Sequence, residues 1–199
     1  MEAEVERGTC HFPRAREAVE DPAHLGRLLV PFQNRRWDSD IRTAVRVARS
    51  GAIGDVHRFE SRIAKMRTVL KDGWRGSPVP EDMGGMLYDL GVHVVDQAVQ
   101  LMGPVASVAC WARSIRPSDP NDDDTTIVLG HTSGALSILS VGQLQAFTEP
   151  RMLLLGTRGG LRIDPAHGVL GLRINVWVSI GVFLAALVWF LWLGRHALP

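Results

Sequence analysis

The sequence predicts an α+β fold: a mostly antiparallel, open β-sheet with helices packed on one of its faces. Two segments with a helical apolar stripe, near residues 38–50 and 84–102, predict the helices. Short runs that alternate apolar and polar residues predict the strands, and glycine-rich or proline-rich turns separate them. A chain of 199 residues, 46% of them hydrophobic, is long enough to bury the core that such a domain needs.

The first elements along the chain are expected to be a helix over residues 14–25 and a strand over 28–32. A helix over 38–50 follows; an aspartate can cap its start, and Gly51 ends it. Residues 55–63 alternate apolar and polar side chains, as a half-buried strand does.

The helix over residues 84–102 has the clearest pattern, with a broad apolar face and a narrow polar stripe. After Gly103 and Pro104 the period of the pattern changes from a helical one to two. The strands expected from there on cover residues 105–113, 125–130, 135–143, 152–155 and 161–163.

A segment of different character lies near the C-terminus. Residues 174–193 carry no charge, and twenty residues of helix measure about 30 Å, the thickness of a bilayer's hydrocarbon core. Trp177 and Trp192 lie near its two ends, where aromatic belts form. We therefore expect a transmembrane helix here, with a buried core helix as the alternative. The arginines that precede it would leave the globular part in the cytoplasm.

Composition excludes several classes of protein. The 22 basic and 21 acidic side chains nearly balance, which argues against a nucleic-acid partner. Cys10 and Cys110 lie far apart in the sequence, so there is no disulfide framework and no C-x-x-C motif, and a reducing compartment is favoured. The dinucleotide fingerprint G-x-G-x-x-G is absent, as are G-x-S-x-G, the P-loop and H-E-x-x-H.

Asp89, His93 and Asp96 are the side chains most able to carry chemistry. Their spacings of four and three place them within about 60° of one another on a helix. A carboxylate beside an imidazole orients the ring and raises its basicity, which suits a general base. The same side chains could instead bind a metal ion or form an ordinary solvated face, and spacing alone leaves these alternatives open.

A second cluster, Arg35, Arg36 and Trp37, lies between the strand and the helix expected around it. Strand-to-helix turns often carry ligand contacts, so these side chains could hold an anionic or sugar-like ligand. Solvated arginines and a packing tryptophan are the equally open alternative.

Other residues are expected to be structural. Gly84 and Gly85 should let the helix begin close to another backbone segment. The isolated histidines are expected at the surface or in turns; they are His57, His131 and His167.

Several segments, in this order, resemble the Gfo/Idh/MocA oxidoreductases. They are residues 32–40 (FQNRRWDSD), 51–56 (GAIGDV), 59–62 (FESR), 74–75 (WR) and 84–97 (GGMLYDLGVHVVDQ). The resemblance covers about residues 28–164. It implies an N-terminal Rossmann domain that binds NAD or NADP, and a C-terminal α+β domain whose open sheet serves substrate binding and oligomerisation.

The resemblance, together with the uncharged segment near the C-terminus that the family does not normally have, sets the expected domain limits. Residues 1–33 would be a remnant of the nucleotide-binding domain, residues 34–164 the substrate and oligomerisation domain, and residues 174–193 the membrane helix.

Roles for single residues follow from the same resemblance. His93 matches the family's catalytic histidine, which takes the proton of a sugar hydroxyl during hydride transfer, and Asp89 matches the aspartate that works with it. Arg35, Arg36 and Trp37 match the segment close to the nicotinamide and the substrate.

The departures from the family pattern are as informative. The glycine-rich phosphate loop is missing, and so is the Glu-Lys-Pro segment that supplies a catalytic lysine; the two lysines here, Lys65 and Lys71, lie elsewhere. We therefore expect a truncated member that acts on a sugar, polyol or related CH–OH substrate only if a separate Rossmann-domain chain supplies NAD or NADP. Binding of the cofactor by this chain alone is not expected, and whether the chain is an enzyme stays open.

Two other interpretations remain. The chain could be a non-catalytic, membrane-anchored module for sugar binding or assembly, built on the open sheet. Alternatively, the abrupt changes of character near residues 28 and 165 could come from a frameshifted or misjoined gene.

Overall fold

The computed structural model describes residues 32–69, 73–165 and 174–196. The chain divides into two compact units, Met1–Ile163 and Asp164–Pro199, which are described separately. The helix expected over residues 14–25, most of the strand expected over 28–32, and Cys10 and His167 lie outside the described residues.

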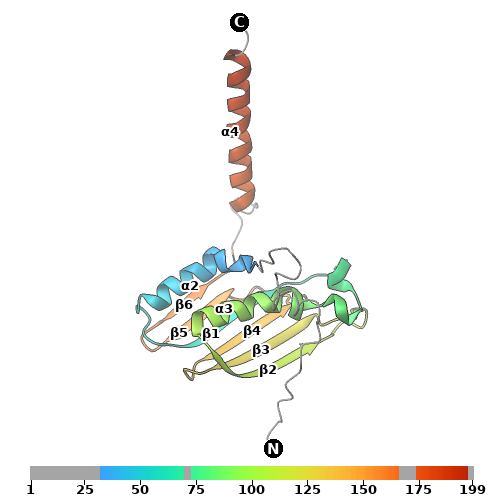
Figure 1. Cartoon of the computed structure of the whole chain (residues 1–199), viewed down its shortest axis with the longest axis vertical. Coiled ribbons are helices and arrows are strands. Elements are labelled where there is room, and N and C mark those ends of the chain that lie inside the picture. The colour runs from blue at the N-terminus through green and yellow to red at the C-terminus, as the bar shows by residue number, and fades with distance from the viewer. Residues whose placement is uncertain (1–31, 70–72, 166–173, 197–199) are drawn as a thin grey trace, which may run out of the picture. The chain divides into compact units, whose positions relative to one another are not determined.

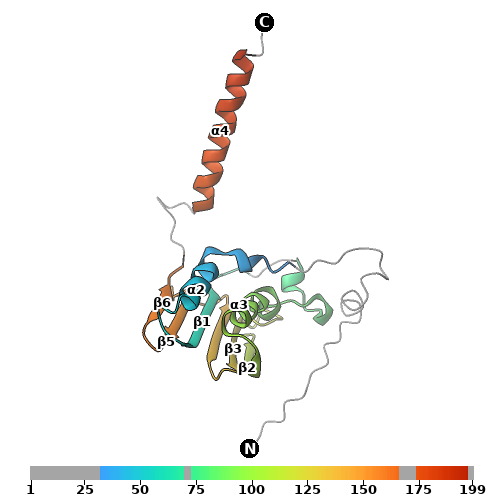
Figure 2. The same ribbon diagram turned by 60° about the vertical axis from the view of Figure 1, so that its left-hand side comes forward.

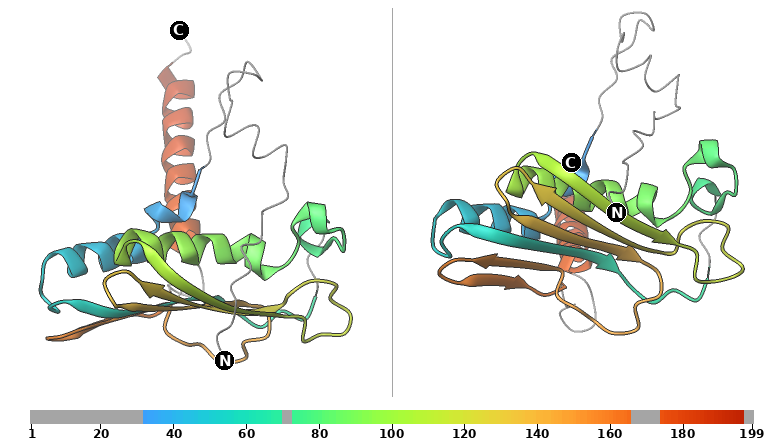
Figure 3. Two further views of the ribbon diagram at one scale, coloured as in Figure 1. Left: turned by 60° about the horizontal axis from the view of Figure 1, so that its bottom comes forward. Right: turned by 90° about the horizontal axis from the view of Figure 1, so that it is seen from below.

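The first unit is an α+β domain built on a six-stranded sheet with the strand order β2-β3-β4-β1-β5-β6 (Figure 1). Its strands are β1 (Val56–Ala64), β2 (Val105–Arg113), β3 (Asp124–His131), β4 (Leu136–Gly142), β5 (Met152–Gly156) and β6 (Gly160–Ile163). Two helices, α2 (Ser39–Arg49) and α3 (Val92–Met102), lie on the same face of the sheet (Figures 2 and 3). Helix α3 packs against β1 and β4, and α2 packs against α3 and β6.

The sheet is mixed, because β1 and β4 run parallel while the other four strand pairs are antiparallel. The long connection from β1 through α3 leads to the antiparallel ladder β2-β3-β4. The third strand of that ladder then lies beside β1 and runs in the same direction. Alternation along a strand predicts which residues are buried but not which strand lies next to it, so the parallel pair could not be foreseen.

The core lies between the sheet and the helices. Phe59, Leu139 and Leu154, from three neighbouring strands, are fully buried. Val94 of α3 and Ala44 of α2 are fully buried as well. Burying a side chain the size of phenylalanine or leucine contributes about 1.5–3 kcal/mol to the free energy of unfolding, so these contacts hold both helices on the sheet.

Helix α2 ends where the sequence predicts. Gly51 has a φ of +70°, the left-handed conformation that favours glycine after a helix. Its backbone N–H donates to the carbonyl of Ala48. The following loop leads to β1 within a few residues.

The segment predicted as one helix over residues 84–102 consists of a π-helical turn, Leu87–Gly91, followed by α3. The Asp122 carboxylate accepts the backbone N–H of Leu87 at 2.8 Å. A Cβ on Gly85, whose φ is +95°, would collide with that carboxylate, and one on Gly84 would lie 2.6 Å from Asn121 Nδ2. The close approach to another backbone segment is confirmed at Gly84, where a Cβ would lie 2.8 Å from the Ser77 carbonyl oxygen; at Gly85 the close neighbour is a side chain.

The second unit contains α4 (Ile174–His196). Among the helices that the structure describes, none has both the length and the apolar character needed to cross a membrane. The transmembrane helix predicted over residues 174–193 is therefore wrong, and the membrane anchor and membrane partner that rested on it have no support.

Candidate active site

His93 lies in the first turn of α3, beside the segment that leads into α2. The charges acting on its ring come from Arg35 and Asp38 before α2, and from Asp89 and Asp96 on its own helical segment. Its Nδ1 atom is buried and has no hydrogen-bond partner among the described residues. The ring is thus surrounded by charged groups while one of its nitrogens stays available.

The surroundings favour the neutral form of this imidazole. Burial lowers the pKa of His93 below its usual 6.5, and the positive charge of Arg35 lowers it further. The carboxylates of Asp89, Asp38 and Asp96 oppose that shift without reversing it. A neutral ring at pH 7 is the form that can accept a proton.

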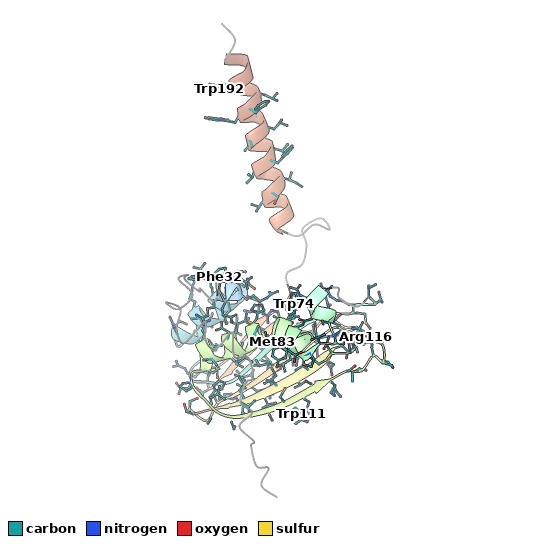
Figure 4. The ribbon with its side chains drawn as sticks, turned by 45° about the vertical axis from the view of Figure 1, so that its right-hand side comes forward. Phe32, Trp74, Met83, Trp111, Arg116 and Trp192 are labelled. Carbon is teal, nitrogen blue, oxygen red and sulfur yellow. The ribbon has the colours of Figure 1, made fainter. Side chains whose placement is uncertain are left out.

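Asp89 lies in the π-helical turn and is held by an arginine from a distant loop. Arg75 Nε donates to Asp89 Oδ1 at 2.9 Å, and only 9% of the Asp89 side chain is exposed. The Arg75 guanidinium also stacks on the ring of Trp74, 4.5 Å from its centre (Trp74 is labelled in Figure 4). π-helical turns within helices are frequent at functional sites, since they displace one side chain from the regular helical register.

Asp96, the third member of the predicted stripe, is bound at both oxygens. Arg36 Nη2 donates to Oδ1 at 2.6 Å and Arg36 Nε donates to Oδ2 at 2.9 Å, while Gln100 Nε2 donates to Oδ2 at 2.9 Å. The hydrogen bond from Arg36 lowers the pKa of Asp96, and the same contact raises the pKa of Arg36. Within the described residues, no group of three or more His, Cys, Asp or Glu side chains is arranged to hold a metal ion.

Arg35, Arg36 and Trp37 lie together on a short 3₁₀ helix, Asn34–Trp37, immediately before α2. Arg36 reaches across to Asp96, and Arg35 pairs with Asp38 at 3.2 Å while acting electrostatically on His93. Trp37 is 66% exposed. The structure therefore places both arginines near His93. They lie far from it in the sequence, and only the family resemblance indicated that the two segments belong to one site.

A buried polar cluster beneath this site was not predicted. Arg151, just before β5, pairs through Nε with Asp40 of α2 at 3.1 Å. Its Nη1 donates to Ser61 Oγ on β1 at 2.6 Å, and its Nη2 donates to Gln97 Oε1 on α3 at 3.2 Å. Burial lowers the pKa of Arg151. These residues share no sequence motif, so only the fold reveals that they meet.

A groove of about 550 Å³ runs between α2 and α3 but does not include His93. Its lining is mostly arginine and apolar side chains from α2: Arg36, Ile41, Arg42, Val45, Arg46, Arg49, Ser50 and Gln100. It meets the surroundings of His93 only at Arg36. We therefore assign the site from the chemistry around His93 rather than from the size of this groove.

Two further polar groups are structural. His131, expected at a surface or in a turn, is buried and lies within hydrogen-bond distance of Gly103 O (3.0 Å) and Ser137 Oγ (2.7 Å). Asp123 is fully buried and accepts the backbone N–H groups of Ile115 and Arg116. His57, in contrast, is exposed as expected.

The starts of α2 and of the π-helical turn do not fit the diphosphate of a dinucleotide. Such a group needs free N–H donors at a helix N-terminus and the absence of negative charge there. At the start of α2, Asp38 and Asp40 are both present, and Asp40 Oδ1 already accepts the N–H of Ile41 at 2.7 Å. At the start of the π-helical turn, the backbone N–H of Leu87 already donates to the Asp122 carboxylate.

Comparison with known proteins identifies the domain that carries these residues. Residues 41–162 match the family described as the GFO/IDH/MocA C-terminal domain. The chain belongs to the GFO/IDH/MocA family. Its site histidine and aspartates therefore lie on the C-terminal domain of an oxidoreductase family, on the face of the sheet that the helices cover.

The similar curated proteins are oxidoreductases. The uncharacterized oxidoreductase YdgJ of Escherichia coli is 34% identical over 76% of this chain, and D-apiose dehydrogenase of Rhizobium rhizogenes is 30% identical over 70%. The scyllo-inositol 2-dehydrogenase (NADP(+)) IolW of Bacillus subtilis is 29% identical over 66%. The matched parts are 43%, 41% and 36% of these proteins, so the chain spans less than half of the length of each.

Solved structures show the same relationship. An NAD-binding protein from Listeria innocua superposes with a TM-score of 0.66 at 27% identity, over 74% of this chain and 41% of that protein. An oxidoreductase from Agrobacterium radiobacter, solved in complex with NAD+, L-tartaric acid and magnesium, superposes with a TM-score of 0.62 at 27% identity, over 76% of this chain and 45% of its own.

Proposed function

We propose that this chain is the substrate-side half of an NAD- or NADP-dependent dehydrogenase that oxidises a CH–OH group of a sugar, a polyol or a related compound. The observation that carries the proposal is His93, a neutral imidazole near the ion-paired Asp89 and Asp96, whose buried Nδ1 has no hydrogen-bond partner among the described residues. The names of two similar proteins, D-apiose dehydrogenase and scyllo-inositol 2-dehydrogenase, support a polyhydroxy substrate.

In this function His93 accepts the proton of the substrate hydroxyl. Asp89, fixed by Arg75, stabilises the imidazolium that results, because a nearby carboxylate favours the charged form of the ring. Arg35, Arg36 and Trp37 line the approach to the ring and contribute polar and aromatic surface for the substrate. The nicotinamide, when it is bound, supplies the acceptor for the hydride.

We infer that the nucleotide is held outside the described part of this chain, because carboxylates already occupy the starts of α2 and of the π-helical turn. We infer that a Rossmann domain, such as that of a separate chain, holds NAD or NADP over the helix-covered face of the sheet. The proton-accepting group and the hydride acceptor would then come from two different folding units.

Titration of the purified chain with NADH and NADPH, followed by the fluorescence of the reduced nicotinamide, tests this division. We expect no saturable binding up to millimolar concentrations. Saturable binding at micromolar concentrations would contradict the division, because the chain would then hold the cofactor without a second unit.

The open face of the sheet supports a second candidate function, assembly without catalysis. On this face the alternation of the strands places Trp111 of β2, Val128 of β3 and Ile138 of β4 on three neighbouring strands. Strand β1 follows with Glu60, and β5 with Leu153. Trp111, on the outermost strand β2, is 55% exposed (Figure 4). Such a face favours pairing with a second copy of the chain. Sedimentation velocity of the wild type and of Trp111→Lys tests it: a dimer that the variant dissociates supports assembly, and a monomeric wild type contradicts it.

A further inference from the structure

Two buried polar atoms on α3 lack a hydrogen-bond partner among the described residues. They are His93 Nδ1 and Gln97 Nε2. Residues four apart on a helix are neighbours on its surface, with Cβ atoms about 5–6 Å apart. Buried polar groups in native proteins nearly always have a partner, which includes ordered water. The two atoms therefore indicate a bound group that lies between neighbouring side chains.

The orientation of the Gln97 amide is fixed by the groups around it. Its Oε1 accepts from Arg151 Nη2 at 3.2 Å and from Ser61 Oγ at 3.1 Å. Ser61 Oγ in turn accepts from Arg151 Nη1 at 2.6 Å, so the serine hydroxyl hydrogen is directed at Gln97. A guanidinium only donates, and turning the amide over would set N–H groups against it. The Gln97 Nε2 hydrogens must consequently point away from Arg151 and Ser61.

His93 offers the complementary atom. Since burial and Arg35 favour the neutral ring, only one of its two nitrogens carries a hydrogen at neutral pH. With that hydrogen on Nε2, the buried Nδ1 is a hydrogen-bond acceptor. A donor from Gln97 and an acceptor from His93, one helical turn apart, match a single O–H group, whose oxygen accepts while its hydrogen is donated.

We propose that Gln97 Nε2 and His93 Nδ1 together bind one hydroxyl group, either that of a trapped water molecule or that of the polyhydroxy substrate. The inference rests on the proposed function, because it names the group that His93 meets in that site. Gln97 is then a binding residue for this hydroxyl. Ser61 and Arg151 are positioning residues that act through the Gln97 amide.

Nitrogen-15 NMR of the histidine rings in the full chain, at a pH where His93 is neutral, tests the proposal. An unprotonated ring nitrogen shifts upfield when it accepts a hydrogen bond. We expect the His93 Nδ1 signal at the hydrogen-bonded position without any ligand if the hydroxyl belongs to water, or only after addition of scyllo-inositol if it belongs to the substrate. A signal at the free position in both samples would overturn the proposal.

A matched pair of variants assigns the effect to Gln97. Gln97→Met keeps the length of the side chain and removes its donor, so the hydrogen-bonded shift should be lost. Gln100→Met removes another glutamine of α3, which donates to Asp96, and should leave the shift unchanged. An unchanged shift in a folded Gln97→Met chain would overturn the proposal. If that variant fails to fold, NOEs from the wild-type Gln97 amide hydrogens to water or scyllo-inositol decide, and their absence overturns it.

Failure of this inference and failure of the proposed function can be told apart. If the His93 signal is at the free position but a complex with a nucleotide-binding domain oxidises polyols in a His93-dependent way, only the hydroxyl assignment is wrong. If the hydroxyl is found but substitution of His93 leaves such activity intact, the proposed function is wrong and the binding site stands.

Discussion

Arg36 and Asp96 are joined by a two-point ion pair, with Nη2–Oδ1 at 2.6 Å and Nε–Oδ2 at 2.9 Å, although 60 residues separate them in the sequence. This contact ties the 3₁₀ helix before α2 to α3 one turn beyond His93. Two parallel N–H donors fix the relative orientation of both groups, which a single contact would not do. The site around His93 is thus closed on one side by a contact between the two helical segments.

Arg36→Lys should raise the pKa of Asp96 toward its usual value, because lysine offers a point charge in place of the two-point contact. In the wild type the lowered pKa means that this contribution to stability is present above about pH 4, the pKa of an unfolded aspartate, and is lost as the pH falls through the folded pKa. Carbon-13 NMR of the Asp96 carboxyl measures the pKa directly. An unchanged pKa in the variant would show that Arg36 is not what lowers it.

His93 should make the protein less stable at mildly acidic pH. Its folded pKa lies below 6.5, so the unfolded chain binds the proton first as the pH falls. The free energy of unfolding should therefore decrease as the pH falls from about 7, just above the pKa of an unfolded histidine, to the folded pKa of His93.

His93→Gln removes this titration. The urea midpoint of the variant should change less between pH 7.5 and pH 5.5 than that of the wild type. An equal change in both proteins would mean that the pKa of His93 is not lowered by folding. His57→Gln, which removes an exposed histidine, serves as the control.

Gly85→Ala should be much more destabilising than Gly134→Ala. Both glycines have positive φ angles, +95° and +84°, and a non-glycine residue there costs about 1–2 kcal/mol. A Cβ on Gly134 would meet nothing within 4 Å, whereas one on Gly85 would collide with the Asp122 carboxylate that holds Leu87. Urea unfolding should show a loss of about 1–2 kcal/mol for Gly134→Ala and at least about 2 kcal/mol more for Gly85→Ala. Equal losses would contradict the role of Asp122.

Arg151→Met should lower the free energy of unfolding by about 3–5 kcal/mol, because the buried groups that pair with the Arg151 guanidinium lose their hydrogen-bond donor. Those partners are Asp40, Ser61 and Gln97, from three different elements. Arg46→Met, at an exposed arginine of α2, is the matched control and should stay within about 0.5 kcal/mol of the wild type. A similar loss in the two variants would show that the buried cluster contributes little.

The elements of the sheet could be predicted because their pattern is local. Strand β2 has the predicted limits, and each of β3 to β6 differs from its predicted limits by at most one residue at each end. Alternation marks the strands, and turn residues mark their two ends. The pairing of β1 with β4 and the meeting of Arg151 with Gln97 depend on residues far apart in the sequence. No local pattern carries that information.

The candidate site shows the same division. The stripe Asp89, His93 and Asp96 can be recognised from its spacing on a helix. The arginines that pair with Asp89 and Asp96 come from two separate 3₁₀ helices, Gly73–Gly76 and Asn34–Trp37. The membrane helix predicted over residues 174–193 is wrong, because no helix that the structure describes has both the length and the apolar character required. Composition alone cannot replace the structure of the segment.

The most direct test of the central claim is the rate of NAD- or NADP-dependent oxidation of scyllo-inositol and D-apiose by this chain combined with a separate chain that carries a Rossmann domain for NAD or NADP. We expect no rate from either part alone and a measurable rate from the combination. His93→Ala should lower that rate by about 100-fold or more, the usual contribution of a general base. Oxidation that persists at the wild-type rate in His93→Ala would contradict the account.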